Sequence, residues 1–217
     1  MILFGSGNML SDAYDCCRAT NRRVTAIFLN APETIRPRTK SLVRRLEELA
    51  EAPMVAPLAA FSPGQGEEYF VVPTTPLKAA LVDQLKERFG ITFARLVHPT
   101  AYVSPYATLG EGVFVGAISV VGPGASLHDH AFVNRGVTVG HDTQVESYAR
   151  LQPGCNIGGH VTIGHGAMVG IGANVREELV IGAGATIAAG AAVIADVPSG
   201  ALVAGVPATV KRAGPGR

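Results

Sequence analysis

An aliphatic residue recurs at every sixth position of this chain from Val97 to Val193 without a break. A second series, four residues later in each hexad and running from Ala101 to Val197, contains only small or aliphatic residues. A six-residue repeat of this kind is typical of a parallel β-helix, in which each hexad forms a short strand and a turn. Three hexads would then close one triangular coil. The members of the first series are Val97, Val103, Leu109, Val115, Val121, Leu127, Val133, Val139, Val145, Leu151, Ile157, Ile163, Val169, Val175, Ile181, Ile187 and Val193.

The repeat predicts which residues lie above one another, because each residue n should lie under residue n+18. Stacked strands are about 4.8 Å apart, so backbone hydrogen bonds should run between coils while both series fill a narrow core. Handedness does not follow from the spacing, since parallel crossovers are right-handed in nearly all sheets. Glycine often follows the aliphatic residue, and we expect positive φ in turns at Gly110, Gly116, Gly122, Gly140, Gly158, Gly164, Gly170 and Gly182.

The part of the chain before the repeat has a different pattern, with β-branched runs alternating with helical segments. This pattern predicts a small α/β domain with a parallel sheet. The 217 residues therefore divide into an α/β domain of residues 1–96 and a β-helix domain of residues 97–217. The expected strands are 1–4, 24–29, 54–58 and 69–72, the expected helices are 9–21, 39–52 and 76–89, and a short strand over 91–96 should lead into the coil.

Composition excludes several classes of partner. A net charge of +1, with 6% aromatic residues and no tryptophan, gives neither a basic surface nor a stacking platform for nucleic acid. No apolar stretch is long enough to span a bilayer, and the first residues lack the features of a secretory signal, so we expect a cytoplasmic protein without membrane insertion. Cys16, Cys17 and Cys155 form no disulfide framework and are predicted to be buried, reduced thiols.

The segment FGSGNM follows the first predicted strand and opens the first helix. Backbone N–H groups of Gly5, Gly7 and Asn8 could hold a phosphate there. A dinucleotide fingerprint would have a third glycine near Leu10 and an acid at the end of the second strand, where this chain has Asn30. A tight strand-to-helix turn without a ligand stays an alternative.

The strongest catalytic candidate is His141, which is followed by Asp142. His141 occupies the third position of its hexad, which projects outward from the core. Gly159 lies 18 residues further on, so no side chain would cover the imidazole, and a slender acyl chain could lie against the bare backbone. Asp142 could hold the tautomer of the ring or raise its basicity, as a general base requires. An ordinary surface histidine is the alternative.

Several segments together carry a family resemblance: the GxG turn after the first strand, LVHPTAYVSPYATLGEGV at the start of the coil, Asn134 with the His141–Asp142 pair, CNIGGHVTIG, and the closing ALVAGVPA. With them the chain resembles, over nearly its whole length, the bacterial nucleotide-sugar acetyltransferases of the left-handed β-helix type. This family includes the sialic acid O-acetyltransferases and the bacillosamine and perosamine N-acetyltransferases. The resemblance implies a left-handed coil and a homotrimer with active sites between subunits. It also implies acetyl-CoA as co-substrate, no metal, and a nucleotide-linked amino sugar bound by the N-terminal domain.

The resemblance also implies roles for particular residues. His141 would be the general base and Asp142 its partner, and Gly159 would offer a backbone contact near the thioester. The residues implied on the substrate side are Asn134, Gly5, Gly7, Asn8 and Asn30, and those implied along the CoA arm are Gly159, His160, Gly182, Gly190, Ala204 and Pro207. Family members commonly carry a Gly-Gly-His type of turn and often an acid near Asn30. The departures here leave UDP, dTDP and GDP open as the nucleotide.

The predicted reaction is acetyl transfer from acetyl-CoA to an amino group, at C4 of a nucleotide-linked 4-amino-4,6-dideoxy sugar, with His141 taking the proton. O-acetylation of the sialic acid type is one alternative. A zinc enzyme similar to the γ-class carbonic anhydrases is another, because His160 and His165 are five residues apart, but it needs a third stacked histidine. A trimeric scaffold without catalysis is the third. No hexad is interrupted, so no long loop should cover the site.

Overall fold

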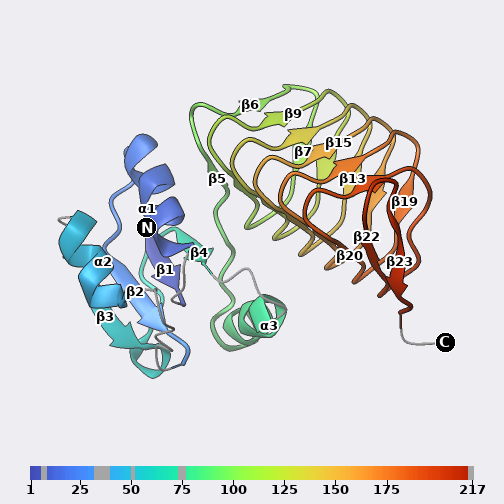
Figure 1. Ribbon diagram of the computed structural model, residues 1–217. Coiled ribbons are helices and arrows are strands. Elements are labelled where there is room, and N and C mark those ends of the chain that lie inside the picture. Colours follow the sequence, from blue (N-terminus) through green and yellow to red (C-terminus); the bar gives the residue numbers. More distant parts are fainter. Residues whose placement is uncertain (6–8, 32–39, 50–51, 73–76, 215–217) are drawn as a thin grey trace. The chain divides into compact units, whose positions relative to one another are not determined.

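The computed structural model describes residues 1–5, 9–31, 40–49, 52–72 and 77–214. The chain forms two compact units, Met1–Ala94 and Arg95–Arg217 (Figure 1). The boundary expected from the sequence, between residues 96 and 97, lies next to this division. No helix in the described ranges is long and apolar enough to cross a membrane.

The N-terminal unit contains a parallel four-stranded sheet in the order β3-β2-β1-β4. Its elements are β1 (Ile2–Phe4), α1 (Leu10–Ala19), β2 (Ala26–Leu29), α2 (Leu42–Leu49), β3 (Met54–Pro57), the 3-10 helix η1 (Leu58–Ala60), β4 (Tyr69–Val71) and α3 (Leu77–Phe89). The α/β unit with a small parallel sheet that the sequence predicts is confirmed, with element ends within a few residues of the expected ones.

Aromatic rings fill the core of this unit around Phe61. Phe61 packs edge to face against Phe4 and Phe89, with ring centroids 4.8 Å apart in each pair, and against Phe28 at 5.0 Å. Edge-to-face contacts of this kind add to the stabilisation from apolar burial. The rings come from two strands, a loop and α3, so they hold the helix and the sheet together.

Lys78 of α3 is an unusual member of this unit, because its side chain is only 4% exposed. Its Nζ lies 5.5 Å from the centroid of the Phe70 ring. Burial disfavours the charged ammonium and lowers the pKa of Lys78 to about 7. The N-terminal unit therefore carries a lysine that is easily neutralised.

The strand predicted over 91–96 is wrong for residues 91–95. Only Leu96 and Val97 form a strand, β5. Ile91 and Phe93 are buried at alternate positions, which gives the apolar alternation of a strand. Their segment instead makes a single backbone contact with β4, from Ala94 N–H to the Tyr69 carbonyl, and no ladder.

The C-terminal unit is a left-handed parallel β-helix with three faces, as the sequence and the resemblance predict (Figure 1). Face one contains β5 (Leu96–Val97), β8 (Phe114–Val115), β11 (Phe132–Val133), β14 (Arg150–Leu151), β17 (Met168–Val169), β20 (Thr186–Ile187), β22 (Leu202–Ala204) and β23 (Thr209–Arg212). Face two contains β6 (Tyr102–Val103), β9 (Val120–Val121), β12 (Thr138–Val139), β15 (Asn156–Ile157), β18 (Asn174–Val175) and β21 (Ala192–Val193). Face three contains β7 (Thr108–Leu109), β10 (Ser126–Leu127), β13 (Gln144–Val145), β16 (Thr162–Ile163) and β19 (Val180–Ile181).

The strand pairing has the predicted register of 18 residues. Leu109 pairs with Leu127 and Leu127 with Val145, and Val133 pairs with Leu151. Both hexad series form one apolar cluster inside the prism, in which Leu151 and other members are fully buried. The position of a residue along the prism and around it therefore follows from its number.

The reason given for the glycines after the aliphatic residues is wrong. Positive φ occurs two residues later in the hexads, for example at Gly112 and Gly124, and at none of the eight glycines named above. Those glycines are required because successive coils approach closely. A Cβ atom on Gly140 would lie 2.5 Å from the carbonyl carbon of Gly158, and one on Gly110 would lie 2.6 Å from the backbone nitrogen of Asp129.

Candidate active site

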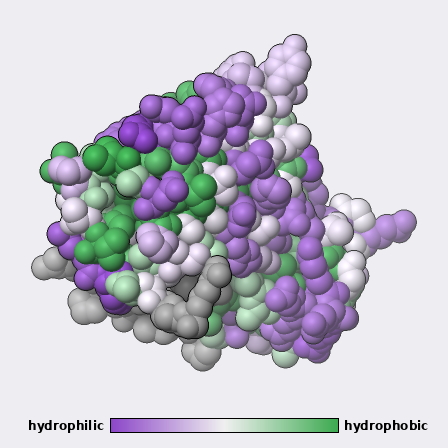
Figure 2. Space-filling view, turned by 90° about the vertical axis from the view of Figure 1, so that its right-hand side faces the viewer, coloured by the Kyte–Doolittle hydropathy of each residue, from purple (hydrophilic) through white to green (hydrophobic). Residues whose placement is uncertain are grey.

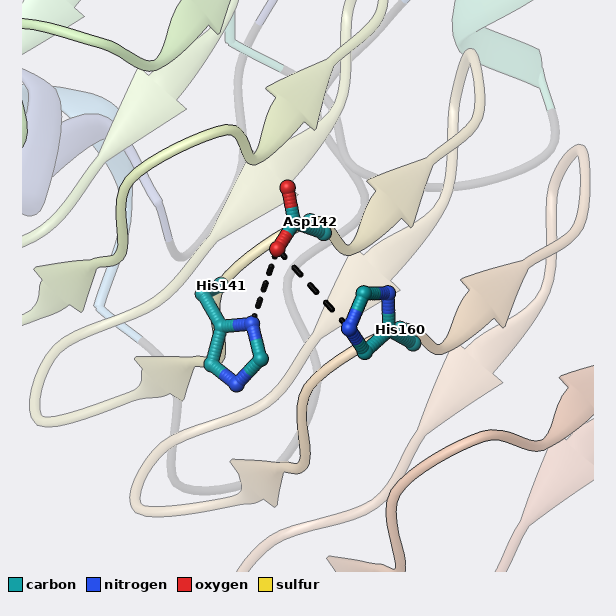
Figure 3. A group of neighbouring side chains, drawn as sticks. All are labelled: His141, Asp142 and His160. Atoms are coloured by element: carbon teal, nitrogen blue, oxygen red, sulfur yellow. Dashed lines mark hydrogen bonds and ion pairs between the residues drawn. The ribbon is translucent and has the colours of Figure 1, made fainter.

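The candidate site lies along one corner of the prism, between faces two and three. In one coil this corner is the turn of residues 140–143 between β12 and β13, and in the next coil it is the turn of residues 158–161 between β15 and β16. We call this edge the site corner. It places Gly159 against His141 and brings His160 close to Asp142 (Figure 3).

His141 and Asp142 form a hydrogen-bonded pair at this corner. His141 Nδ1 lies 2.8 Å from Asp142 Oδ2, and the two side chains are 56% and 53% exposed. An ionised carboxylate can only accept, so this bond assigns the ring proton to Nδ1 and leaves Nε2 as an acceptor. The pair therefore presents a basic nitrogen at the surface of the chain, with its tautomer fixed.

The imidazole lies against bare backbone. A Cβ atom on Gly159 would be 2.7 Å from His141 Nε2 and 2.9 Å from Cε1. Real side chains do not approach so closely, so any residue larger than glycine at this position would displace the ring. The 18-residue register thus places the basic nitrogen of His141 beside the backbone of Gly159.

The backbone N–H of Gly159 is a candidate hydrogen-bond donor to an anion. At equivalent turn positions this amide bonds a carboxylate oxygen: Glu111 N–H donates to Asp129 Oδ1 at 2.8 Å, and His165 N–H donates to Glu146 Oε2 at 2.7 Å. Among the residues that the structure describes, Gly159 N–H has no acceptor. An amide in this position can stabilise negative charge that develops next to His141 Nε2.

His160 completes the cluster. Its Nε2 lies 3.9 Å from Asp142 Oδ2, and its ring meets the His141 ring edge to face with centroids 5.0 Å apart (Figure 3). Asp142 and His160 both have φ of +55°, a conformation that favours glycine. Their donor atoms and that of His141 lie within 4.8 Å of one another, a spacing that could hold a cation. In the observed arrangement Asp142 Oδ2 lies near one nitrogen of each imidazole, His141 Nδ1 and His160 Nε2.

The geometry does not support the carbonic-anhydrase alternative. His165 lies at a different corner from His160, between faces three and one, and its ring packs 5.5 Å from that of Tyr148. Over the described residues, the group of three potential metal donors is His141, Asp142 and His160. Within one chain, the two histidines considered as zinc ligands are therefore not brought together.

Asn134 does not lie at the site corner. It begins the turn of residues 134–137, between faces one and two, and its side chain is only 5% exposed. Its Oδ1 accepts a hydrogen bond from Arg135 N–H at 2.8 Å. Within one chain Asn134 therefore lies away from His141, and its contact with substrate stays a prediction.

The residues expected along the CoA arm are distributed over the last coils. Gly182 lies between faces three and one, where a Cβ atom would be 2.4 Å from the Ser199 nitrogen, so close packing explains this glycine. Gly190, with φ of +68°, lies between faces one and two. Ala204 ends β22 and Pro207 is exposed beyond it. Within one chain these four residues do not gather at the site corner.

In the N-terminal unit, the expected nucleotide residues are only partly described. Gly5 has φ of +86° and its N–H donates to the Phe28 carbonyl at 2.8 Å, whereas Gly7 and Asn8 lie outside the described residues. Asn30 is exposed after β2 and lines a cavity of about 610 Å³. Carboxyl ends of parallel strands are a common place for ligands in α/β proteins.

No sequence pattern pointed to two polar residues of this cavity. Gln84 and Arg88 of α3 line it together with the end of β2, most of β3 and the residues that follow these strands. On a helix with an apolar and a polar side, such residues look like ordinary solvent-facing positions. Only the packing of α3 shows that they face a cavity.

The thiols are not suited to covalent catalysis. Cys155 is fully buried inside the prism, and burial raises the pKa of its thiol to about 12. Burial likewise raises the pKa of Cys16 to about 12 and that of Cys17 to about 11. A nucleophilic cysteine needs an accessible thiolate, and these three thiols are protonated and shielded.

The fold and the site define the class to which this chain is similar, that of the β-helix acyltransferases built from hexapeptide repeats. No protein-family model matches the sequence, and no curated protein is significantly similar to it. Solved structures do match. A variant of perosamine N-acetyltransferase from Caulobacter crescentus, with a histidine replaced by asparagine and in complex with CoA and GDP-perosamine, is 28% identical with a TM-score of 0.84, over 98% of this chain and 96% of that chain.

Two further structures extend the comparison. The acetyltransferase domain of PglB from Neisseria gonorrhoeae FA1090, in complex with acetyl coenzyme A, is 27% identical with a TM-score of 0.81, over 96% of this chain and 97% of that chain. WeeI from Acinetobacter baumannii AYE, at 19% identity and a TM-score of 0.74 over 96% and 98% of the two chains, shares the fold. The resemblance to the hexapeptide-repeat sugar acetyltransferases is thus confirmed at the level of structure.

Proposed function

We propose that this protein transfers an acetyl group from acetyl-CoA to the amino group of a nucleotide-linked amino sugar, at C4 of a 4-amino-4,6-dideoxy sugar. One observation carries the proposal: the surface imidazole of His141 has its Nδ1 on Asp142 and its Nε2 beside the bare backbone of Gly159. The comparisons support it, because the perosamine enzyme binds CoA and GDP-perosamine and the PglB domain binds acetyl coenzyme A. Variants of the perosamine enzyme with a histidine replaced by asparagine or alanine have also been solved.

In the proposed reaction the sugar amine attacks the thioester carbonyl carbon while His141 Nε2 accepts a proton from the amine. Asp142 stabilises the resulting imidazolium through the Nδ1 hydrogen bond. The amide of Gly159 donates to the oxyanion, a contribution of about 3 kcal/mol when one such donor is removed in other enzymes. Collapse of the intermediate breaks the C–S bond, and CoA leaves as a thiolate that takes up a proton. No metal is required at any step.

We assign nucleotide binding to the cavity lined by Asn30 at the carboxyl end of the N-terminal sheet. An amide both donates and accepts, so Asn30 does not exclude any nucleotide by charge. Arg88, which lines the same cavity, offers a cation to a phosphate or to the edge of a base. A panel of UDP-, dTDP- and GDP-linked sugars identifies the nucleotide.

We also propose a cytoplasmic homotrimer with active sites between subunits. The coil carries large apolar side chains that are exposed in the single chain, and exposed apolar surface is typical of an assembly interface. These side chains are Ile118, Val120, Ile171, Val180 and Ile194. Figure 2 shows apolar surface exposed beside polar surface on one side of the molecule. Size-exclusion chromatography with light scattering measures the assembly directly.

The proposal is tested by following CoA release from acetyl-CoA with the sugar panel. His141→Ala and His141→Asn should lower kcat by about 10² to 10⁴, the typical contribution of a general base, without changing the assembly. Asp142→Asn should have a smaller effect, because the imidazole stays in place. Activity should persist after treatment with a chelator.

Several results would count against this function. Near-normal turnover of His141→Ala would remove His141 from the role of base, and a larger loss in Asp142→Asn than in His141→Ala would invert the two roles. Release of CoA with a 4-hydroxy sugar but not with its 4-amino counterpart would favour O-acetylation. Absence of CoA binding at millimolar concentration would favour the scaffold alternative.

A further inference from the structure

Two hydroxyl groups are enclosed inside the prism. Ser119 and Thr143 belong to the series of small and aliphatic residues that fills the core, and both are 0% exposed. A hydroxyl buried among apolar side chains is unfavourable unless it forms hydrogen bonds. Their hydrogen-bond partners therefore show what these two residues do.

Thr143 bridges the turn of the next coil. Its Oγ1 accepts a hydrogen bond from Val161 N–H at 3.3 Å and donates one to the Gly158 carbonyl at 2.8 Å. Gly158 and Val161 are the first and fourth residues of the turn that contains Gly159 and His160. The hydroxyl thus lies between the Gly158 carbonyl and the Val161 N–H, the two groups that would bond to each other in a directly closed turn.

Turns of the prism that have alanine as the fourth residue close directly. The alanine N–H donates to the carbonyl of the first residue. Ala149 bonds to the Glu146 carbonyl at 3.1 Å in this way, and Ala167 bonds to the Gly164 carbonyl at 3.0 Å.

At 176–179, a turn that the structure describes in full, the fourth residue is Leu179 and the apolar Val161 lies beneath it, and the structure shows neither the direct bond nor a bridge. The hydroxyl of Thr143 therefore supplies the turn at 158–161 with two bonds that an apolar residue at this position could not form.

Ser119 makes the same bridge one corner away. Its Oγ donates to the Asn134 carbonyl at 2.7 Å and accepts from Val137 N–H at 3.2 Å. The two bridged turns seen among the described residues thus contain Asn134 in one case, and Gly159 with His160 in the other.

We infer that Thr143 is a positioning residue of the candidate active site. Thr143 directly follows Asp142, and its hydroxyl is bonded to the turn that carries Gly159. One residue therefore links the base and its carboxylate to the amide assigned to the oxyanion, and fixes the separation between His141 Nε2 and the Gly159 backbone. This inference rests on the proposed function for its effect on turnover, but not for its effect on the geometry of the turn.

The test compares Thr143→Val with Thr143→Ser. Valine fits this register, since Val137 and Val161 occupy the same series, and it removes only the hydroxyl. We expect Thr143→Val to lower kcat by about 10- to 100-fold, as small misplacements of reacting groups do, and to change the KM for acetyl-CoA by less than about threefold. Thr143→Ser should restore kcat to within about threefold of the wild type.

A matched control and a structural measurement separate positioning from general stability. Val113→Ala removes buried volume from the same series at another corner, and should lower Tm without lowering kcat. In a crystal structure of Thr143→Val, the turn at 158–161 should lose both bridging bonds and resemble the unbridged turn at 176–179, with the Gly159 backbone displaced relative to His141. If valine prevents folding, Thr143→Ala removes the hydroxyl without bulk.

The possible outcomes are distinct. Wild-type kcat in Thr143→Val, an unchanged 158–161 turn in its structure, or failure of serine to restore activity would overturn the inference. If the wild-type protein releases no CoA with any sugar, the proposed function fails. The structures of the two variants then still decide whether the hydroxyl sets the geometry of this turn.

Discussion

Adding one methyl group at Gly159 is the sharpest test of the site geometry. A Cβ atom at this position would lie 2.7 Å from His141 Nε2, whereas ordinary contacts begin at 3.4 Å, so the ring must move by about 0.7 Å. A displacement near 1 Å at a reacting group can cost about 10²-fold in rate. Gly159→Ala should therefore lower kcat/KM for acetyl-CoA by about 10- to 100-fold.

The same substitution should barely change stability. Ala183 and Ala189 occupy the equivalent second position of other turns, so the backbone accepts a methyl group there. The imidazole that must move is more than half exposed and can rotate into solvent. We expect a change of about 0.5 kcal/mol or less in the free energy of unfolding, measured by denaturant titration.

A double-mutant cycle decides whether the methyl group acts through the imidazole. The CoA-release assay is run on Gly159→Ala, His141→Ala and the double variant. If the methyl group displaces the ring, it should cost less than about threefold once the ring is absent. An equal loss in both backgrounds would show that alanine obstructs the thioester directly. Wild-type turnover of Gly159→Ala would refute the claim that the bare backbone positions the base.

Two further predictions concern buried groups. Lys78 has a lowered pKa of about 7 in the folded chain, so between that pH and its ordinary pKa of 10.5 the unfolded chain binds the extra proton. The free energy of unfolding of the wild type, measured in urea, should accordingly rise with pH across this window. Lys78→Met should be more stable than the wild type near pH 7 and should not show this rise. The same pH dependence in the variant as in the wild type would contradict the lowered pKa of Lys78. Cys16, Cys17 and Cys155 have raised pKa values and are buried, so iodoacetamide at pH 8 should label none of them in the native protein and all of them in urea. Rapid native labelling of Cys155 would show that the prism opens.

The hexad repeat alone determines much of the β-helix and of the site corner. Because the side-chain register is fixed at 18 residues, the proximity of His141 to Gly159 follows from their numbers, before any coordinates. Handedness is different, since general rules for parallel crossovers favour the opposite hand. It could be predicted only through the family resemblance.

Other features could not be predicted because they depend on how elements pack. Thr143 belongs to a series of small residues and looks like a core filler; its role depends on a turn carbonyl that no pattern reveals. Lys78 looks like a solvent-facing residue of a helix until the packing of α3 is known. At Gly140 the sequence pattern indicates a turn but does not distinguish a need for positive φ from close contact between coils.

The last strand of the chain has a consequence for self-association. A stack of coils ends in unpaired backbone N–H and C=O groups, which another molecule could extend into a fibre. On face one, β23 turns back and runs antiparallel to β22, pairing Ala204 with Thr209. The reversal ends the parallel ladder with an antiparallel strand of the same chain, so on this face another molecule meets the edge of β23, with its exposed Lys211 and Arg212, in place of a parallel strand that a further coil could extend.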